Sequence, residues 1–134
     1  MDKYTALYED VYSVFATSDW NAESIKTFPE NFVGNNVGST YIRVAILPSS
    51  NGANWRSVSG LVMIDIFVPA GGGTRSITQI ADKLDKYLAG QEFKNTNNGK
   101  TSFIGSTLSV LGNDRDNPSL YRASYSIPFN YFGV

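Results

Sequence analysis

The stretch from Trp55 to Val68 constrains the fold most, because it is apolar on both sides of an extended chain. Successive side chains of a β-strand point to opposite faces of the sheet. One face carries Val58, Gly60, Val62, Ile64, Ile66 and Val68, and the other carries Leu61, Met63, Asp65 and Phe67. We therefore expect a central strand that is covered on both sides. In a domain this small, another subunit can supply the second cover.

Amphipathic helices are predicted before and after this strand, from Lys3 to Thr17 and from Thr74 to Leu88. Each carries apolar side chains at the helical spacing of one buried stripe. The stripes are Leu7, Val11, Val14 and Phe15 in the first helix, and Ile77, Ile80, Ala81, Leu84 and Leu88 in the second. Asp2 suits the N-cap of the first helix, and Gly90 is placed to end the second.

Further strands are predicted at Thr40 to Leu47, Ser102 to Leu111 and Leu120 to Phe129. Pro48 stops the first of them. Pro128 places the last at an edge of the sheet or ends it there, because proline cannot donate to a β-ladder. The remaining stretches are rich in turn-forming residues and are expected to be irregular, namely Ser18 to Ser39, Ser49 to Asn54, Asn95 to Lys100 and Gly112 to Pro118.

These elements predict one α+β domain over residues 1–134 in the order α-β-β-α-β-β. Two helices pack on one face of a small, mostly antiparallel sheet. The chain is 42% hydrophobic and 17% charged, which suits a packed core and not a disordered chain.

The chain contains no histidine and no cysteine, which limits the kinds of catalytic and metal sites it can form. Their absence excludes disulfides, thiolate nucleophiles, Cys/His zinc sites and the Ser-His-Asp triad. A net charge of −1 argues against nucleic acid as the main partner, because neutralisation of phosphates dominates that affinity. No apolar run approaches the roughly 20 residues that cross a bilayer, and no secretory leader is recognised. We expect a non-enzymatic protein with no cofactor, no metal and no membrane partner.

The turn Ala70-Gly71-Gly72-Gly73-Thr74, between a strand and a helix, is the one candidate anion site, since free amides at a helix start attract anions. It lacks the Lys-Ser/Thr pair of a P-loop and the spacing of a dinucleotide-binding loop. We favour a flexible turn with Thr74 or Ser76 as N-cap. A small anion- or nucleotide-binding protein remains the alternative.

Several residues are candidates for contacts with other subunits. Trp55 and Arg56 lie at a predicted hairpin edge, and Arg115 lies between two aspartates in a turn. Phe67 and Asp65 share the second face of the central strand. Asp65 has two equally weighted interpretations, a contact to an arginine of a partner subunit or a position that faces water. Other carboxylates, such as Asp82 and Asp85 on the second helix, are interpreted as an ordinary solvated face.

The segment from Ser57 to Gly73 resembles a family of small tail proteins of long-tailed bacteriophages, the tail terminators. The similarity rests on the ending Asp65-Ile66-Phe67-Val68-Pro69, the glycine turn and the helix from Ile77 to Leu88. The end of the chain, Pro128-Phe129-Asn130-Tyr131, is similar to a Pro-Phe-x-Tyr motif of the same family. Together with the N-terminal helix, the match spans most of the chain in order.

The resemblance implies a protein that assembles into a homo-hexameric ring at the head-proximal end of the virion tail. Such rings cap the tail tube, stop its polymerisation and present a surface to head-completion or connector proteins. The implied partners are other copies of this chain, the major tail tube protein and the connector, with genome DNA passing through the ring and no specific nucleic-acid contact. Another neck or tail-tube component is the alternative within the same class.

Overall fold

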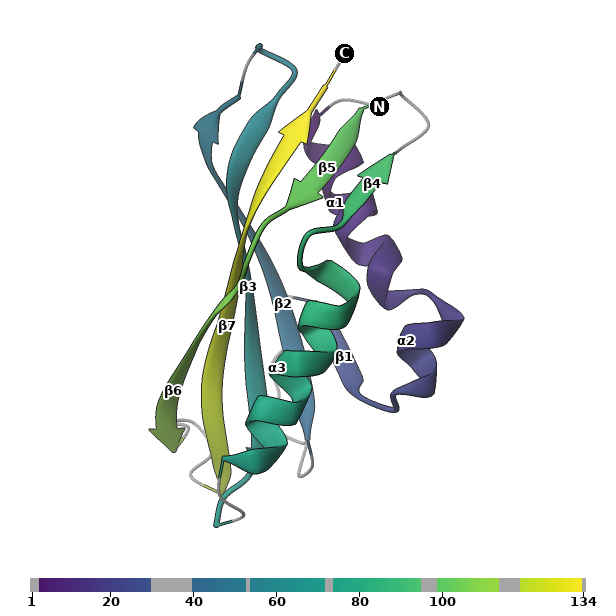
Figure 1. The fold of residues 1–134 in the computed structure, drawn as a ribbon. Coiled ribbons are helices and arrows are strands. Elements are labelled where there is room, and N and C mark those ends of the chain that lie inside the picture. The colour runs from purple at the N-terminus through teal and green to yellow at the C-terminus, as the bar shows by residue number, and fades with distance from the viewer. Residues whose placement is uncertain are drawn as a thin grey trace.

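The computed structural model describes residues 3–29, 40–52, 54–71, 74–94, 99–113 and 119–133. It confirms the α+β class, with helices packed against a mixed, seven-stranded sheet (Figure 1). The helices are α1 (Lys3–Phe15), α2 (Ser18–Ala22) and α3 (Arg75–Leu88). The strands are β1 (Lys26–Pro29), β2 (Tyr41–Asn51), β3 (Val58–Pro69), β4 (Glu92–Lys94), β5 (Lys100–Phe103), β6 (Thr107–Asn113) and β7 (Leu120–Phe132).

The sheet is built around β3, the strand predicted to be central. It pairs antiparallel with β2 on one side and with β7 on the other, from Val58↔Tyr131 to Pro69↔Leu120. The strand order is β1-β2-β3-β7-β5-β4, and β6 pairs with β7 beyond the end of β5. Among the described strands only β1 and β2 pair in parallel. The sheet is therefore mostly antiparallel, as predicted.

The hydrophobic core lies between one face of this sheet and the helices α1 and α3 (Figure 1). The predicted helical stripes are buried: Leu7, Val11, Val14 and Phe15 in α1, and Ile77, Ile80, Ala81, Leu84 and Leu88 in α3. They meet side chains of β3 that include Val62, Ile64 and Ile66, which are completely buried. Burying one such aliphatic side chain contributes about 1.5–3 kcal/mol, so this layer accounts for much of the stability.

The prediction of an irregular stretch from Ser18 to Ser39 is wrong in its first part, which forms α2 and β1. The hydroxyl oxygen of Thr17 accepts from the backbone N–H of Trp20 and caps α2. Trp20 is 1% exposed, and its indole N–H donates to Thr27 of β1 over 2.9 Å. The cap from Thr17 and the buried Trp20 thus order this segment, although its composition is typical of turns. Residues 30–39 lie outside the described part of the chain.

The predictions that Pro48 ends its strand and that Pro128 lies at an edge or a strand end are both wrong. Each proline nitrogen points to a side of its strand where no β-ladder needs an N–H donor. β2 continues past Pro48 to Asn51, with a register shift between Pro48 and Ser50. Pro128 lies within β7, which is paired on both sides and is not an edge strand. The carbonyl of Pro128 accepts from Ile104, in the gap between β5 and β6, and its ring nitrogen faces that same gap.

The predicted strand from Ser102 to Leu111 is divided by that gap. β5 ends at Phe103 and β6 begins at Thr107, and both pair with β7 at different levels. The short strand β4, which pairs with β5, was not predicted either. Three residues are too few to show a periodic pattern.

Candidate functional site

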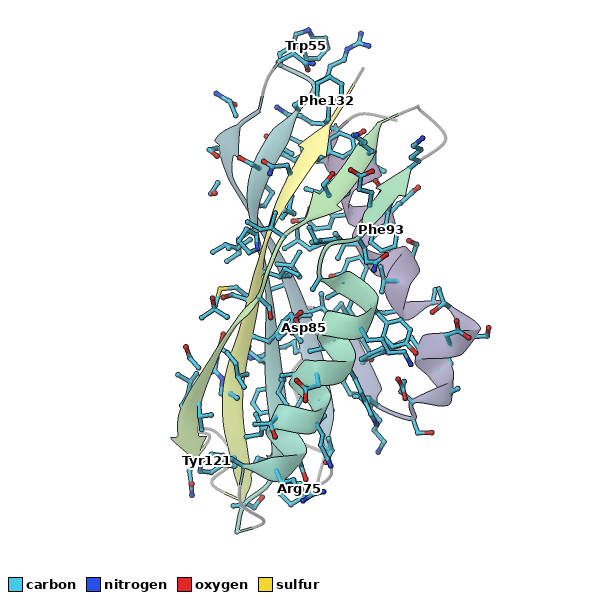
Figure 2. All side chains as sticks on the ribbon, in the orientation of Figure 1. Trp55, Arg75, Asp85, Phe93, Tyr121 and Phe132 are labelled. Atoms are coloured by element: carbon cyan, nitrogen blue, oxygen red, sulfur yellow. The ribbon has the colours of Figure 1, made fainter. Side chains whose placement is uncertain are left out.

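The candidate site is the face of the sheet that points away from α1 and α3, here called the outer face (Figures 1 and 2). Register places Arg43, Asp65 and Ser124 in one row across β2, β3 and β7, and Ala45, Met63 and Ser126 in the next. The following row is Leu47, Leu61 and Pro128. In the described part of the chain, no helix or strand lies over these rows. Over these three rows, the predicted second cover of β3 is therefore not supplied by a described helix or strand.

An apolar patch occupies the middle of the outer face and consists of Ala45, Leu47, Leu61, Met63 and Pro128. Leu47 is 44% exposed and Leu61 is 37% exposed, whereas the other three are half-buried. Their positions on three adjacent strands make the patch continuous. Contiguous exposed apolar surface that is bordered by polar side chains is typical of protein interaction sites.

Beside the patch, Asp65 bridges two arginines of its own chain. Its carboxylate oxygens accept from Arg43 over 3.0 Å and from Arg122 over 3.1 Å. The Asp65 side chain is 17% exposed, and the arginine side chains are 27% and 35% exposed, respectively. Arg43 was not predicted as a partner, although it lies directly opposite Asp65 in the register. Asp65 thus joins β2 to β7 across β3 through two guanidinium groups.

Phe67 lies next to this ion pair but is buried within the chain. Its ring stacks on Tyr41 at a centroid distance of 4.5 Å, and Leu120 packs beside them. The guanidinium groups of Arg43 and Arg122 lie over the Phe67 ring, at 5.4 Å and 5.9 Å from its centroid. The aromatic ring therefore helps to hold both arginines in place.

Two further predicted residues, Trp55 and Arg56, lie at the hairpin end of the molecule, where Figure 2 labels Trp55. Trp55 is 74% exposed, and the guanidinium of Arg56 lies 4.7 Å from its ring centroid. The backbone there is anchored, because Asn54 donates to the carbonyl of Gly133 and the N–H of Gly133 donates to Ser57. The structure thus brings Asp65 and Phe67 together and places Trp55 with Arg56 elsewhere. Arg115 lies outside the described residues.

One carboxylate belongs to the interior and not to the solvated face predicted for it. Asp85 of α3 is half-buried and accepts from Tyr125 and from Ser106, each over 2.6 Å. Burial of Tyr125 and its hydrogen bond to Asp85 raise the pKa of that phenol well above its usual range. Tyr125 therefore stays neutral and ties α3 to β7. Asp82 is exposed, as predicted.

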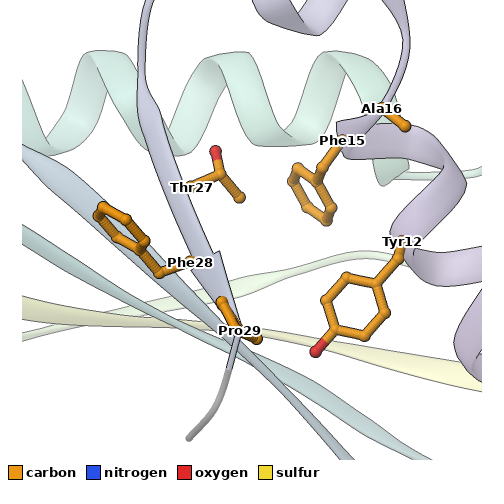
Figure 3. Close-up of a pocket in the computed structure, with 6 residues that line it drawn as sticks. All are labelled: Tyr12, Phe15, Ala16, Thr27, Phe28 and Pro29. Carbon is orange, nitrogen blue, oxygen red and sulfur yellow. The ribbon is translucent and has the colours of Figure 1, made fainter. Parts of the chain in front are cut away.

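A small cavity of about 210 Å³ opens between α1 and β1 (Figure 3). It is lined by Tyr12, Phe15, Ala16, Thr27, Phe28 and Pro29. Its two hydroxyl groups are engaged, since Tyr12 donates to Val44 and Thr27 donates to Ile25. None of the described residues that line the cavity is charged.

The structure describes only part of the glycine turn before α3. Gly72 and Gly73 lie outside the described residues, and Gly71 has a φ of +90°, which suits glycine. Thr74 occupies the N-cap position, one of the two predicted, but makes no side-chain capping hydrogen bond. Within the described ranges, no cluster of three or more acidic residues is arranged to hold a metal ion. No described helix has the length and apolar character needed to span a membrane.

Comparison with known proteins adds the fold and nothing on activity. No protein-family model and no curated protein matches the chain. One solved structure, whose name states no function, is similar over 98% of this chain and 94% of its own, with a TM-score of 0.61 and 14% sequence identity. At that identity the similarity shows a shared fold alone.

Proposed function

We propose that the protein is a tail terminator of a long-tailed phage, a non-enzymatic subunit that forms a ring on the end of the tail tube. One structural observation carries the assembly part of this proposal: no described helix or strand covers the apolar patch on the outer face of the sheet. The phage assignment itself comes from the resemblance of Ser57 to Gly73 and of the C-terminal motif to that family.

The outer face has the composition of a contact surface. Leu47 and Leu61 supply exposed apolar area at its centre, and serines of β7 and the ion pair around Asp65 surround it. Interfaces between proteins commonly combine an apolar centre with a polar rim.

In this proposal the ring forms in the host cytoplasm and remains at the head-proximal end of the tail. Its partners are further copies of the chain, the major tail tube protein and a head-completion or connector protein. A neck or tube component would use the same kind of surface with different neighbours, so the experiment must separate capping from incorporation along the tube.

The test is to add the purified protein to polymerising tail-tube subunits and to image the products by electron microscopy. Shortened tubes with a ring at one end are the expected result. Tubes of undiminished length with bare ends would contradict the terminator role. Density along the tube, in place of a ring at its end, would instead favour a tube component.

A further inference from the structure

The strand β6 leaves one backbone edge unpaired. It runs antiparallel to β7, from Thr107↔Ser126 to Asn113↔Tyr121, and no other described strand pairs with it. Figure 1 shows β6 at the margin of the sheet, away from α1 and α2. An edge of this kind is a template for another strand unless charges, prolines or a covering element block it.

The register identifies which groups of β6 point outward. Because the carbonyl of Pro128 accepts from Ile104, the polar groups of Pro128 face the side of β7 on which β5 and β6 lie. Alternation along β7 gives Ser126 and Ser124 the same direction, so their partners Thr107 and Ser109 bond inward. The N–H and C=O groups of Leu108 and Val110 therefore point away from the sheet.

The edge of β6 lacks the features that usually prevent pairing with another strand. The sequence from Thr107 to Asn113 contains no charged residue and no proline. Val110 is 44% exposed and Leu111 is 55% exposed. Apolar side chains beside free backbone groups favour pairing with an extended chain.

On the opposite side of the sheet, the edge of β2 is partly occupied by β1 and by side chains of α1. Beyond the reach of β1, the carbonyl of Ile46 accepts from the hydroxyl of Tyr8 in α1, over 3.2 Å. The carbonyl of Val44 accepts from Tyr12 over 3.4 Å. Pro48, two residues beyond Ile46, has no N–H to offer. This part of the β2 edge therefore offers a second strand fewer backbone groups than the edge of β6 does.

We propose that β6 pairs antiparallel with β6 of a second copy, across a two-fold axis that passes beside Ser109. Leu108 of each copy then lies opposite Val110 of the other, and their outward N–H and C=O groups bond to each other. Self-pairing places Ser109 opposite its own copy, so a charge at that position would meet a like charge. β6 carries none. The register shift between Val110 and Gly112 ends the regular edge and keeps the pair centred on Ser109.

This inference goes beyond the proposed function, because it concerns the free protein in solution and not the ring on a tube. The two-fold pair covers the open edge while no tube end is present. Its experiment measures the free protein alone, so failure of the pair and failure of tube capping are separate results.

The test uses Ser109, which is exposed and lies opposite itself in the pair. Light scattering over a concentration series should give a dimer for the unchanged protein. Both Ser109→Lys and Ser109→Asp should weaken the dimer about fivefold or more, because each sets like charges directly opposite one another. An equimolar mixture of the two variants should restore a dimer that contains one of each.

Gln79→Lys, at an exposed position of α3, is the matched control and should leave the dimer unchanged. Hydrogen exchange gives a second measurement that needs no variant to fold. The amides of Leu108 and Val110 should become protected as the concentration of the unchanged protein rises. A monomer at every concentration, or a Ser109→Lys protein that dimerises as tightly as the unchanged one, would overturn the proposal.

Discussion

On the helix-covered face of the sheet, Val62 and Ile64 are completely buried, whereas Leu61 and Met63, their neighbours in β3, remain partly exposed on the outer face. The same strand therefore supplies two apolar surfaces. The described chain covers the inner one, and on the outer one it buries Phe67 but leaves Leu61 and Met63 partly exposed. Folding accounts for the inner surface. The outer face exposes apolar side chains that do not contribute to the folded core, and contact with another protein would bury them.

The largest expected effect comes from the inner face. Ile64→Ala should destabilise the protein by about 2–5 kcal/mol, since it leaves a cavity in a packed layer. Denaturant unfolding of the purified variant measures this loss. Leu61→Ala is the comparison within the same strand, and we expect a loss of about 1 kcal/mol or less because Leu61 is already exposed. Equal losses at the two positions would contradict the difference between the faces.

The polar link inside the helix-covered layer should have an intermediate effect. Tyr125→Phe removes the hydrogen bond to Asp85 and should cost about 1 kcal/mol at neutral pH. Because burial raises the pKa of Tyr125 in the folded protein, the neutral phenol stabilises the fold fully below about pH 10. That contribution is lost as the pH rises from about 10 toward the higher folded-state pKa.

Unfolding measured across this alkaline range checks the prediction. The unchanged protein should lose stability more steeply above about pH 10 than Tyr125→Phe does. Parallel curves for the two proteins would show that the buried phenol does not control this loss.

The ion pair of the outer face should contribute less to stability and more to assembly. Asp65→Ala leaves Arg43 and Arg122 without their shared carboxylate. Since the arginine side chains are 27% and 35% exposed, water can reach part of each guanidinium group, and the expected cost to folding is about 1 kcal/mol. The variant should fold but assemble poorly. Normal oligomer size and normal tube capping by Asp65→Ala would remove this ion pair from the contact surface.

The smallest effect on stability is expected at the centre of the apolar patch. Leu47→Ser should leave the free energy of unfolding within about 1 kcal/mol, because Leu47 is 44% exposed. Thermal unfolding measures this change. A large loss would mean that the patch belongs to the folding core, and the contrast between the two faces would then be wrong.

The sequence predicted the elements whose periodicity is long and regular. The stripes of α1 and α3 are buried as expected, and so are Val62, Ile64, Ile66 and Val68 on the inner face of β3, because those patterns report packing against one layer. It could not predict α2 and β1, which depend on the capping contact of Thr17 and the packing of Trp20 over a short segment. Such contacts leave no periodic signal.

The candidate site was predictable only in part, for a related reason. Asp65 stood out because it interrupts an apolar strand, yet its partners depend on register, which places Arg43 opposite it and Arg122 on the next strand. The prolines show the same limit. Pro128 can lie inside β7 because its ring nitrogen faces the gap between β5 and β6, where no neighbouring strand needs an N–H donor. The sequence does not show where that gap lies.

The central claim is that the outer face is the assembly surface, and tube capping by one pair of variants tests it most directly. Leu61→Lys places a charge in the apolar patch, whereas Gln79→Lys places the same charge on the exposed side of α3. Both variants should fold. In electron micrographs of growing tubes, Gln79→Lys should cap ends as the unchanged protein does, and Leu61→Lys should leave long tubes with bare ends. Capping by Leu61→Lys at the level of the control would contradict the claim.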